Sequence, residues 1–185
     1  SQLVMSSLPA LPSGPFDQMS PMCGHENLLM GMALDGEWTR TMADLYMTVM
    51  VRLLEILFER EGLPDALWVW DDLGFKHRPF MSPAMYRALL FPAHKMLFDF
   101  AHSCGLPVVL HCDGYVEPLI PDLIEAGINC LQPIEIKAGM DLLRLKQRFG
   151  DRIALIGGMD ERVLESNDLR LVDAELQSKV PLAMA

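Results

Sequence analysis

Short apolar runs alternate with longer helical patterns along most of this chain, and this alternation limits the folds open to it. The runs lie at 67–70, 108–110, 128–131 and 153–156, a length that suits buried strands. Strands that alternate with helices form parallel βα units, in which right-handed crossovers place helices over the sheet. The sequence therefore predicts an α/β protein with a parallel sheet.

Four helices are predicted beside these runs, over 39–61, 82–103, 118–126 and 141–148. Gly62 ends the first of them. That helix has seven apolar residues at helical spacing, which predicts that they form the face that packs on the core. They are Met42, Leu45, Tyr46, Val49, Leu53, Ile56 and Leu57.

The two ends of the chain are less regular. Residues 1–36 are rich in Pro, Gly, Ser and Met, so a long loop is predicted there, although 3–5 can form a strand. Asp160 and Asn167 can each begin a further helix. The apolar residues 180–185 predict a last strand with no helix after it.

The chain length decides between two architectures. A (β/α)8 TIM barrel needs about 250 residues, whereas this chain has 185. Four strands, with one more at each end, predict a single domain over 1–185 that is a barrel present only in part. A complete open sheet with helices on both faces is the alternative, but the last apolar run lacks the helix that such a sheet would place after it.

Composition argues against several classes of partner. The 15 Lys and Arg against 25 Asp and Glu give a formal charge of -10, which disfavours nucleic acid. No apolar run reaches the roughly 18–20 residues of a membrane helix, and no signal peptide is visible. The four cysteines form no C-x-x-C pair and are expected to be reduced thiols. We therefore expect a cytoplasmic protein with no membrane partner.

Polar residues follow each predicted strand at its carboxyl end, where parallel α/β folds bind ligands. We expect these residues to converge on a small-molecule substrate. The candidate catalytic residues are Asp71, Asp72, His111, Asp113 and Glu135, and the candidate substrate-binding residues are Gln132, Gly157 and Asp160.

His111 and Asp113 are two residues apart, so an extended backbone points both to one side and turns Cys112 away. An imidazole and a carboxylate on one face can bind a metal or transfer a proton. A turn at Asp113, with His111 capping a carbonyl, is the structural alternative. At least one of Asp71 and Asp72 is expected to cap backbone N–H groups, which leaves the other for the site.

Other conspicuous residues have simpler interpretations. Trp68 and Trp70 alternate with aliphatic residues and are expected in the core. Gly157-Gly158 matches no phosphate-binding motif, so a tight turn is predicted. His94 has no partner at ligand spacing and is expected to be structural or solvated.

Several stretches between 65 and 165 form an ordered set of motifs. They are Asp71-Asp72-Leu73-Gly74, Met81-Ser82-Pro83, Leu110-His111-Cys112-Asp113-Gly114, Gln132-Pro133-Ile134-Glu135, Ala138-Gly139-Met140-Asp141 and Ile156-Gly157-Gly158-Met159-Asp160. Together they resemble the uroporphyrinogen decarboxylase superfamily, which contains the haem-pathway decarboxylase and corrinoid-dependent methyltransferases. The resemblance implies a (β/α)8 barrel whose N-terminal units and last segment lie outside this chain.

Differences from the family motifs separate its branches. In the methyltransferases that this chain resembles, a His-x-Cys motif binds zinc. The matching positions of this chain are His111-x-Asp113. The implied metal ligands are therefore His111 and Asp113, and the implied ion is Zn²⁺, which accepts N and O ligands. The decarboxylase needs no metal, and its motif Phe-Asp-Ser-Trp-Ala-Gly stands where this chain has Trp70 to Phe75.

Three hypotheses for function follow from the resemblance and the site. The first is an enzyme of the methyltransferase-like branch, with metal-assisted methyl transfer and a corrinoid protein as partner. The second is a metal-free porphyrinogen decarboxylase, which needs a basic pocket that these acidic strand ends do not predict. The third is an inactive fragment stabilised by association, because a partial barrel exposes sheet edges and an apolar face. We expect a homodimer or higher oligomer.

Overall fold

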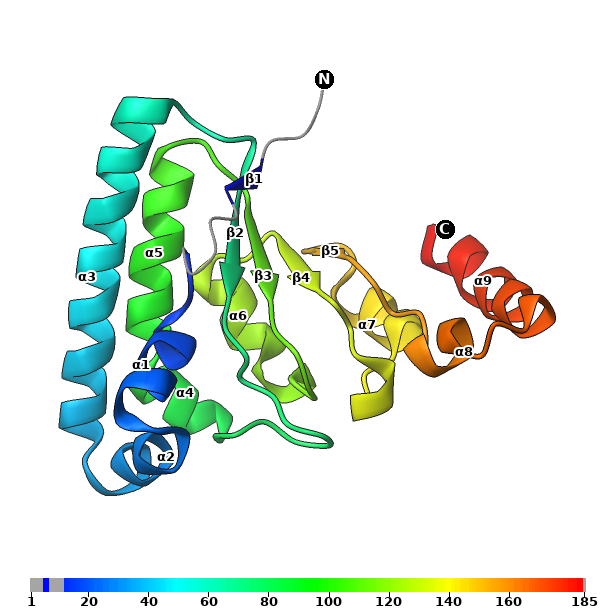
Figure 1. Ribbon diagram of the computed structural model, residues 1–185, viewed down its shortest axis with the longest axis horizontal. Coiled ribbons are helices and arrows are strands. Elements are labelled where there is room, and N and C mark those ends of the chain that lie inside the picture. The colour runs from blue at the N-terminus through cyan, green and yellow to red at the C-terminus, as the bar shows by residue number, and fades with distance from the viewer. Residues whose placement is uncertain (1–4, 7–11, 185) are drawn as a thin grey trace.

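The computed structural model describes residues 5–6 and 12–184, and a five-stranded parallel sheet lies at its centre (Figure 1). The register pairs Leu67 with Val108 and Val109 with Cys130. The strands are β1 (Met5–Ser6), β2 (Ala66–Trp70), β3 (Val108–His111), β4 (Cys130–Gln132) and β5 (Ala154–Leu155).

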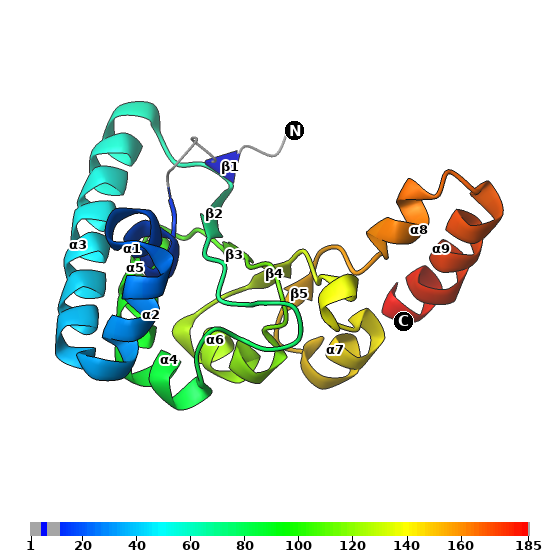
Figure 2. The ribbon, with the colours of Figure 1, turned by 60° about the horizontal axis from the view of Figure 1, so that its bottom comes forward.

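The strands follow one another across the sheet in chain order, β1-β2-β3-β4-β5. A doubly wound sheet reverses direction at a switch point, and no reversal occurs among the described strands. The helices α3, α5, α6 and α7 form a row along one face of the sheet (Figure 1 and Figure 2). The structure is therefore part of a (β/α) barrel, as the alternation of strands and helices predicts.

Nine α-helices and two short 3₁₀-helices are found in the described residues. The α-helices are α1 (Pro15–Cys23), α2 (His25–Leu34), α3 (Gly36–Glu61), α4 (Pro83–Leu89), α5 (Phe91–Ser103), α6 (Ile120–Ala126), α7 (Leu142–Phe149), α8 (Glu161–Glu165) and α9 (Leu169–Met184), and the 3₁₀-helices are η1 (Glu117–Leu119) and η2 (Ile136–Ala138).

Alternate side chains of the central strands face opposite sides of the sheet. Leu67, Val69 and Leu110 are fully buried under the helices, as expected for parallel strands covered on that face. The other face is more open, and Trp70 is 42% exposed there. The prediction that Trp70 belongs to the core is therefore wrong, because its strand position points it to the uncovered side.

Helices replace most of the long loop predicted for 1–36. Pro15 lies in the first turn of α1, where its missing N–H is not needed. Phe16, Met19 and Leu28 are buried, so tertiary packing stabilises helices whose composition is typical of loops. Of the strand predicted at 3–5, residues 3 and 4 lie outside the described residues.

Helix α3 turns to the core a face that only partly overlaps the one predicted, since Met42, Tyr46 and Leu57 pack against the core but are only partly buried. Three residues of the predicted face are exposed: Leu45 by 61%, Val49 by 50% and Leu53 by 44%. The buried residues instead are Thr39, Ala43, Met47, Met50, Leu54 and Phe58. Both faces are apolar, so the pattern identified the helix but not the side that packs inward.

Two other predictions about helices are wrong. The single helix predicted over 82–103 is divided at Leu90 into α4 and α5, because Pro92 has no N–H for an intrahelical bond. Residues 180–184 continue α9 instead of forming a strand. A strand there would need a neighbour for its backbone groups, whereas a helix satisfies its own.

The cysteines and the hydropathy of the helices agree with what composition predicts. All four cysteines are free thiols, as expected. Within residues 5–6 and 12–184, no helix is both long and apolar enough to cross a bilayer.

Candidate functional site

A row of three side chains crosses the sheet at the carboxyl ends of β2, β3 and β4. The register places His111 between Trp70 and Gln132. The ring centroids of Trp70 and His111 are 4.1 Å apart, and Nδ1 of His111 hydrogen-bonds the side-chain oxygen of Gln132. An imidazole that donates its Nδ1–H to an amide oxygen presents the lone pair of Nε2 to a ligand.

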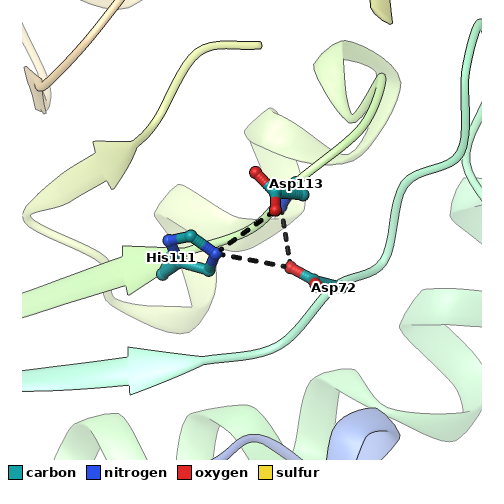
Figure 3. A group of neighbouring side chains, drawn as sticks. All are labelled: Asp72, His111 and Asp113. Atoms are coloured by element: carbon teal, nitrogen blue, oxygen red, sulfur yellow. Dashed lines mark hydrogen bonds and ion pairs between the residues drawn. The ribbon is translucent and has the colours of Figure 1, made fainter.

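Two carboxylates face Nε2 of His111 just beyond this row (Figure 3). Nε2 lies 3.8 Å from Oδ1 of Asp72 and 3.6 Å from Oδ2 of Asp113. The backbone N–H of Asp113 donates to Oδ1 of Asp72 at 2.8 Å, which joins the loops after β2 and β3. One possible ligand atom from each residue lies within 4.8 Å of the others.

These three groups fit a divalent cation. Ligand atoms about 2.0–2.2 Å from a tetrahedral zinc lie roughly 3.3–3.6 Å from one another, close to the separations of His111 from Asp72 and Asp113. Cys112 is buried, and its Sγ accepts the backbone N–H of Leu73 at 3.2 Å. Burial raises the pKa of the Cys112 thiol well above its usual value. The donor set is therefore one nitrogen and two oxygens, without a thiolate.

A contact between two glycines sets the spacing of the two carboxylate loops. A Cβ on Gly74 would lie 2.4 Å from the carbonyl oxygen of Asp113, and a Cβ on Gly114 would lie 2.3 Å from the carbonyl carbon of Gly74. Gly114 also has a φ of 83°, a conformation that favours glycine. The sequence contains both glycines within family-like motifs, but the pattern does not reveal that they touch.

Glu135 lies beside this cluster. Its Oε2 accepts the backbone N–H of Gly114 at 2.7 Å, and its Oε1 is 3.6 Å from Nζ of Lys137. Glu135 and Lys137, with Asp113 and Met159, border a pocket of about 140 Å³. The structure therefore provides room for a small ligand next to Asp113.

Asp71 is fully buried behind the cluster, so no substrate reaches it. Its Oδ1 accepts the backbone N–H of Asp17 at 2.7 Å, and its Oδ2 lies 2.9 Å from Nε2 of His94. These last two atoms are close but do not form a hydrogen bond. Nδ1 of His94 lies 3.0 Å from the hydroxyl of Tyr86. No spacing pattern in the sequence reveals these buried contacts among Asp71, His94 and Tyr86.

The family model for uroporphyrinogen decarboxylase (URO-D) matches residues 7–181. The chain belongs to the URO-D family. The matched region contains every strand-end residue described above. A search of curated proteins finds no match.

The URO-D chain is similar in fold to a solved structure, a methyltransferase from Methanosarcina mazei, with a TM-score of 0.63 and 22% sequence identity. The match covers 78% of this chain and 40% of that chain. This chain therefore spans less than half the length of that methyltransferase. At this identity, the likeness establishes the shared fold, which agrees with a partial barrel.

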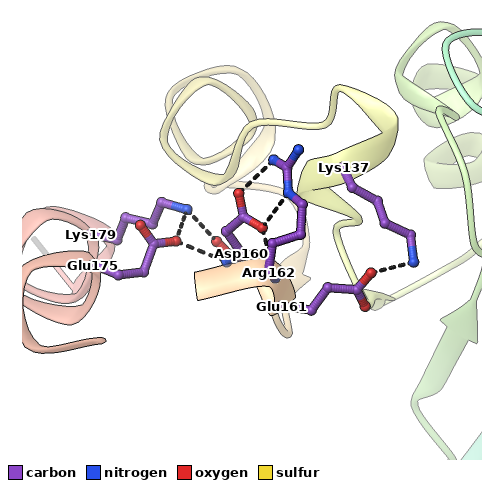
Figure 4. Close-up of polar contacts among 7 residues, drawn as sticks. Lys137, Asp160, Glu161, Arg162, Glu175 and Lys179 are labelled. Atoms are coloured by element: carbon purple, nitrogen blue, oxygen red, sulfur yellow. Dashed lines mark hydrogen bonds and ion pairs between the residues drawn. The ribbon is translucent and has the colours of Figure 1, made fainter. Parts of the chain in front are cut away.

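Two further predicted site residues, Gly157 and Asp160, lie after β5 and also stand outside the three-residue cluster. Asp160 caps α8, and its Oδ2 lies 2.6 Å from the guanidinium of Arg162 (Figure 4). The backbone N–H of Asp160 donates to Glu175 of α9 at 2.8 Å. Gly157 packs against the carbonyl of Pro133 with a φ of 99°. The carboxylate of Asp160 thus holds α8 in place.

Asp17, at the start of α1, is an acidic neighbour of the site that sequence reasoning missed. Its Oδ2 accepts the backbone N–H of Asp72 at 3.2 Å. Burial, followed by the charges of Asp71, Asp72 and Asp113, raises the pKa of Asp17 to about 7. Four carboxyl groups from three segments therefore share a small volume.

Replacing Asp17 with asparagine should stabilise the metal-free protein at pH 8. Because the pKa of Asp17 is raised on folding from 3.8 to about 7, the stability that the protonated carboxyl contributes is lost as the pH rises through that range. Asparagine retains an acceptor for the Asp72 N–H and carries no charge. Asp17 is only partly buried, so we expect a gain of about 1 kcal/mol.

Urea denaturation in EDTA measures this difference. The gain should be present at pH 8 and should nearly vanish at pH 4, where the wild-type carboxyl also binds a proton. An Asp17→Asn protein less stable than the wild type at pH 8 would contradict the explanation.

Proposed function

We propose that this URO-D chain carries the metal site of a methyltransferase-like enzyme, with Asp72, His111 and Asp113 as ligands of a divalent cation and Zn²⁺ as the first ion to test. One observation carries the proposal: an imidazole nitrogen and two carboxylate oxygens converge within 4.8 Å. They do so at the carboxyl ends of parallel strands, where such folds bind ligands.

The neighbouring residues have defined tasks under this proposal. Gln132 holds His111 by Nδ1, so that Nε2 points toward the carboxylates. Trp70 contacts one side of the ring, and the N–H of Gly114 fixes Glu135 at the pocket. A metal bound here would supply a Lewis acid that lowers the pKa of a substrate heteroatom.

The proposed methyl acceptor is a small molecule with a nucleophilic heteroatom, because the pocket beside Asp113 has a volume of about 140 Å³. The proposed donor is a methylated corrinoid on a partner protein, which the family motifs and the methyltransferase name of the similar structure support. The methyl carbon would leave cobalt and bond to the heteroatom. The electron pair would stay on cobalt, and the heteroatom would release its proton.

The proposed cellular setting is the cytoplasm, which the four free thiols support.

Porphyrinogen decarboxylation fits the site less well. Its substrate is a polycarboxylate, which needs cationic groups for binding. Asp72, Asp113 and Glu135 instead make this edge acidic, and Lys137 already pairs with Glu135 and Glu161. The charge of the described strand ends therefore favours a cationic or metal-bound ligand.

Zinc binding tests the proposed site. The purified chain is stripped with EDTA, equilibrated with Zn²⁺ and examined by elemental mass spectrometry and calorimetric titration. We expect about one zinc per chain and an affinity lowered roughly 100-fold by His111→Ala, because a ligand is lost. Gln132→Leu should lower it roughly 10-fold, because the ring loses its orientation. His77→Ala removes an exposed imidazole outside the cluster and should have no effect.

A wild-type chain that binds no zinc, or a His111→Ala chain that binds it as tightly, would exclude this site. The reaction is assayed with methylcobalamin and a thiol, by the change in visible absorbance on demethylation. Zinc-loaded wild type should accelerate the transfer and His111→Ala should not. Release of CO₂ from uroporphyrinogen, without methyl transfer, would instead support the decarboxylase.

A further inference from the structure

The loop between β2 and α4 borders an open pocket that the proposed metal site does not use. We call residues 74–80 the basic loop, because Lys76, His77 and Arg78 follow one another in it. The loop extends beyond the carboxyl end of β2 before the chain returns to α4 (Figure 1). The pocket has a volume of about 500 Å³, within the range of small-molecule sites. The residues that line it include Phe75, Arg78, Phe80, Met81, Ser82 and Met85.

Hydrogen bonds hold the basic loop in place, so its pocket is preformed. The backbone N–H of Phe75 donates to the carbonyl oxygen of Arg78 at 2.9 Å, and the carbonyl oxygen of Phe75 accepts the N–H of Tyr115 at 2.8 Å. Nδ1 of His77 lies 3.2 Å from the carbonyl oxygen of Ala138, which fastens the loop to η2. A ligand that enters a preformed site loses less binding free energy to the ordering of the protein.

The two cations of the basic loop differ from most others in the chain. Among the described residues, most Lys and Arg side chains form ion pairs with carboxylates, such as Lys95 with Asp99. Lys76 and Arg78 form no ion pair with a described carboxylate, although the whole chain carries a formal charge of -10. Unpaired positive charge at one place on an acidic protein attracts anions to that place.

Aromatic rings form one wall of the pocket. The ring centroids of Phe75 and Phe80 are 5.6 Å apart. The ring of Phe80 also stacks on the buried Phe16, with the centroids again 5.6 Å apart. Phe75 remains 51% exposed, so much of its ring is left to contact a ligand. Such a wall favours a planar apolar group, because aromatic pairs are stabilised beyond the area that they bury.

Two polar side chains border the same pocket and can hold an anion. The guanidinium of Arg78 can donate two parallel N–H bonds to a phosphate or carboxylate group. The hydroxyl oxygen of Ser82 accepts the backbone N–H of Met85 at 3.2 Å, which leaves the hydroxyl proton free to donate. The pocket therefore combines an apolar wall with donors for negatively charged oxygens.

The charges favour a phosphate over a carboxylate. Nζ of Lys76 lies 5.9 Å from the ring centroid of Phe75, so a second cation stands beside the aromatic wall. A phosphate monoester carries about 1.5–2 negative charges at pH 7, which two cations can balance. We propose that this pocket binds a small aromatic phosphate ester, with its ring against Phe75 and Phe80 and its phosphate on Arg78.

The pocket is distinct from the proposed metal site, although the two are neighbours. None of Asp72, His111 and Asp113 lines it, whereas Gly74, at the base of the basic loop, is in close contact with Gly114. The phosphate ester is bound by cations and rings of the chain alone. It can therefore bind when zinc does not, and zinc can bind when it does not.

Calorimetric titration of the chain in EDTA tests the proposal, because the probe cannot then coordinate a metal. The probe is 1-naphthyl phosphate, and 1-naphthol and inorganic phosphate represent its two halves. We expect a dissociation constant on the order of 100 µM for the probe. Each half should bind at least roughly 10-fold more weakly, because it makes only part of the contacts. Added salt should weaken binding of the probe.

Three variants locate the binding site. Arg78→Gln should weaken binding of 1-naphthyl phosphate roughly 10-fold and leave binding of 1-naphthol unchanged, because only the charge is lost. Phe75→Ser should weaken binding of both. Arg152→Gln is the matched control, since Arg152 is an exposed cation outside the pocket, and it should have no effect. Far-UV circular dichroism confirms that the variants are folded.

Two results would overturn the proposal directly: no binding of 1-naphthyl phosphate at about 1 mM, or equal binding by the wild type and Arg78→Gln. An acidic peptide of Asp and Glu around one Phe is titrated in parallel. If it binds at least roughly 10-fold more tightly than the probe, and loses that affinity in Arg78→Gln, the pocket is a docking site for a protein segment and the small-molecule assignment is wrong.

Discussion

Replacing His94 with alanine should lower the free energy of unfolding by about 3–5 kcal/mol. The imidazole is fully buried between Oδ2 of Asp71 and the hydroxyl of Tyr86. Alanine would leave a cavity and remove the group that faces a buried carboxylate. Both changes destabilise the folded state, and the second also loosens the start of α1, which Asp71 holds through the Asp17 N–H.

Urea denaturation of His94→Ala and of three further variants separates these contributions. His102→Ala removes an exposed imidazole from the same helix and should cost about 1 kcal/mol or less. Asp71→Asn, made in the His94→Ala background, should cost less than it does alone, because the carboxylate has already lost its partner. Additive losses would show that Asp71 and His94 are not coupled, and a His94→Ala loss below that of His102→Ala would refute the burial argument.

Replacing Gly114 with alanine should have a comparably large effect, at the site as well as on stability. The added Cβ would lie 2.3 Å from the carbonyl carbon of Gly74, so one of the two loops must move. That movement separates Asp72 from Asp113, whose backbone N–H now donates to the Asp72 carboxylate at 2.8 Å. We expect a loss of about 3 kcal/mol in stability and at least roughly 10-fold in zinc affinity.

Gly105→Ala is the matched control. Gly105 has a φ of 76°, close to that of Gly114, but a Cβ there would meet no atom within 4 Å. Its replacement should cost about 1 kcal/mol, from backbone strain alone, and should leave zinc affinity unchanged. Equal losses in the two variants would show that the glycine contact does not set the spacing of the carboxylates.

Much of the site could be predicted because strand geometry is regular. The two-residue period places His111 and Asp113 on one side and turns Cys112 away, as the structure has it. The period also explains why Asp72, two residues beyond Trp70, lies at the level of Asp113. What the sequence could not supply was the register, which puts Gln132 beside His111.

The errors arise where distant residues or two equal patterns decide the structure. Helical periodicity identified α3, but Leu45 and Met47 belong to faces of similar hydrophobicity, and only packing shows which one is covered. The contact of Asp71 with His94 joins a loop to a helix and leaves no trace in local spacing. The Pro and Gly residues in 15–34 led to the prediction of a loop. Local composition does not show that Phe16 and Leu28 become buried, and this burial stabilises helices there.

Because the strands lie in the sheet in chain order, its two ends should differ in how easily they unfold locally. Each strand is hydrogen-bonded only to neighbours in the chain, among the strands described, so the sheet can open from the β5 edge without breaking the β2–β3 ladder. The last helix, α9, has no buried residue to oppose that opening. Amide hydrogens should therefore exchange first near the C-terminal end and last around β2 and β3. The three ligands follow those two slowly exchanging strands, so a cation would be held by the most protected part of the sheet.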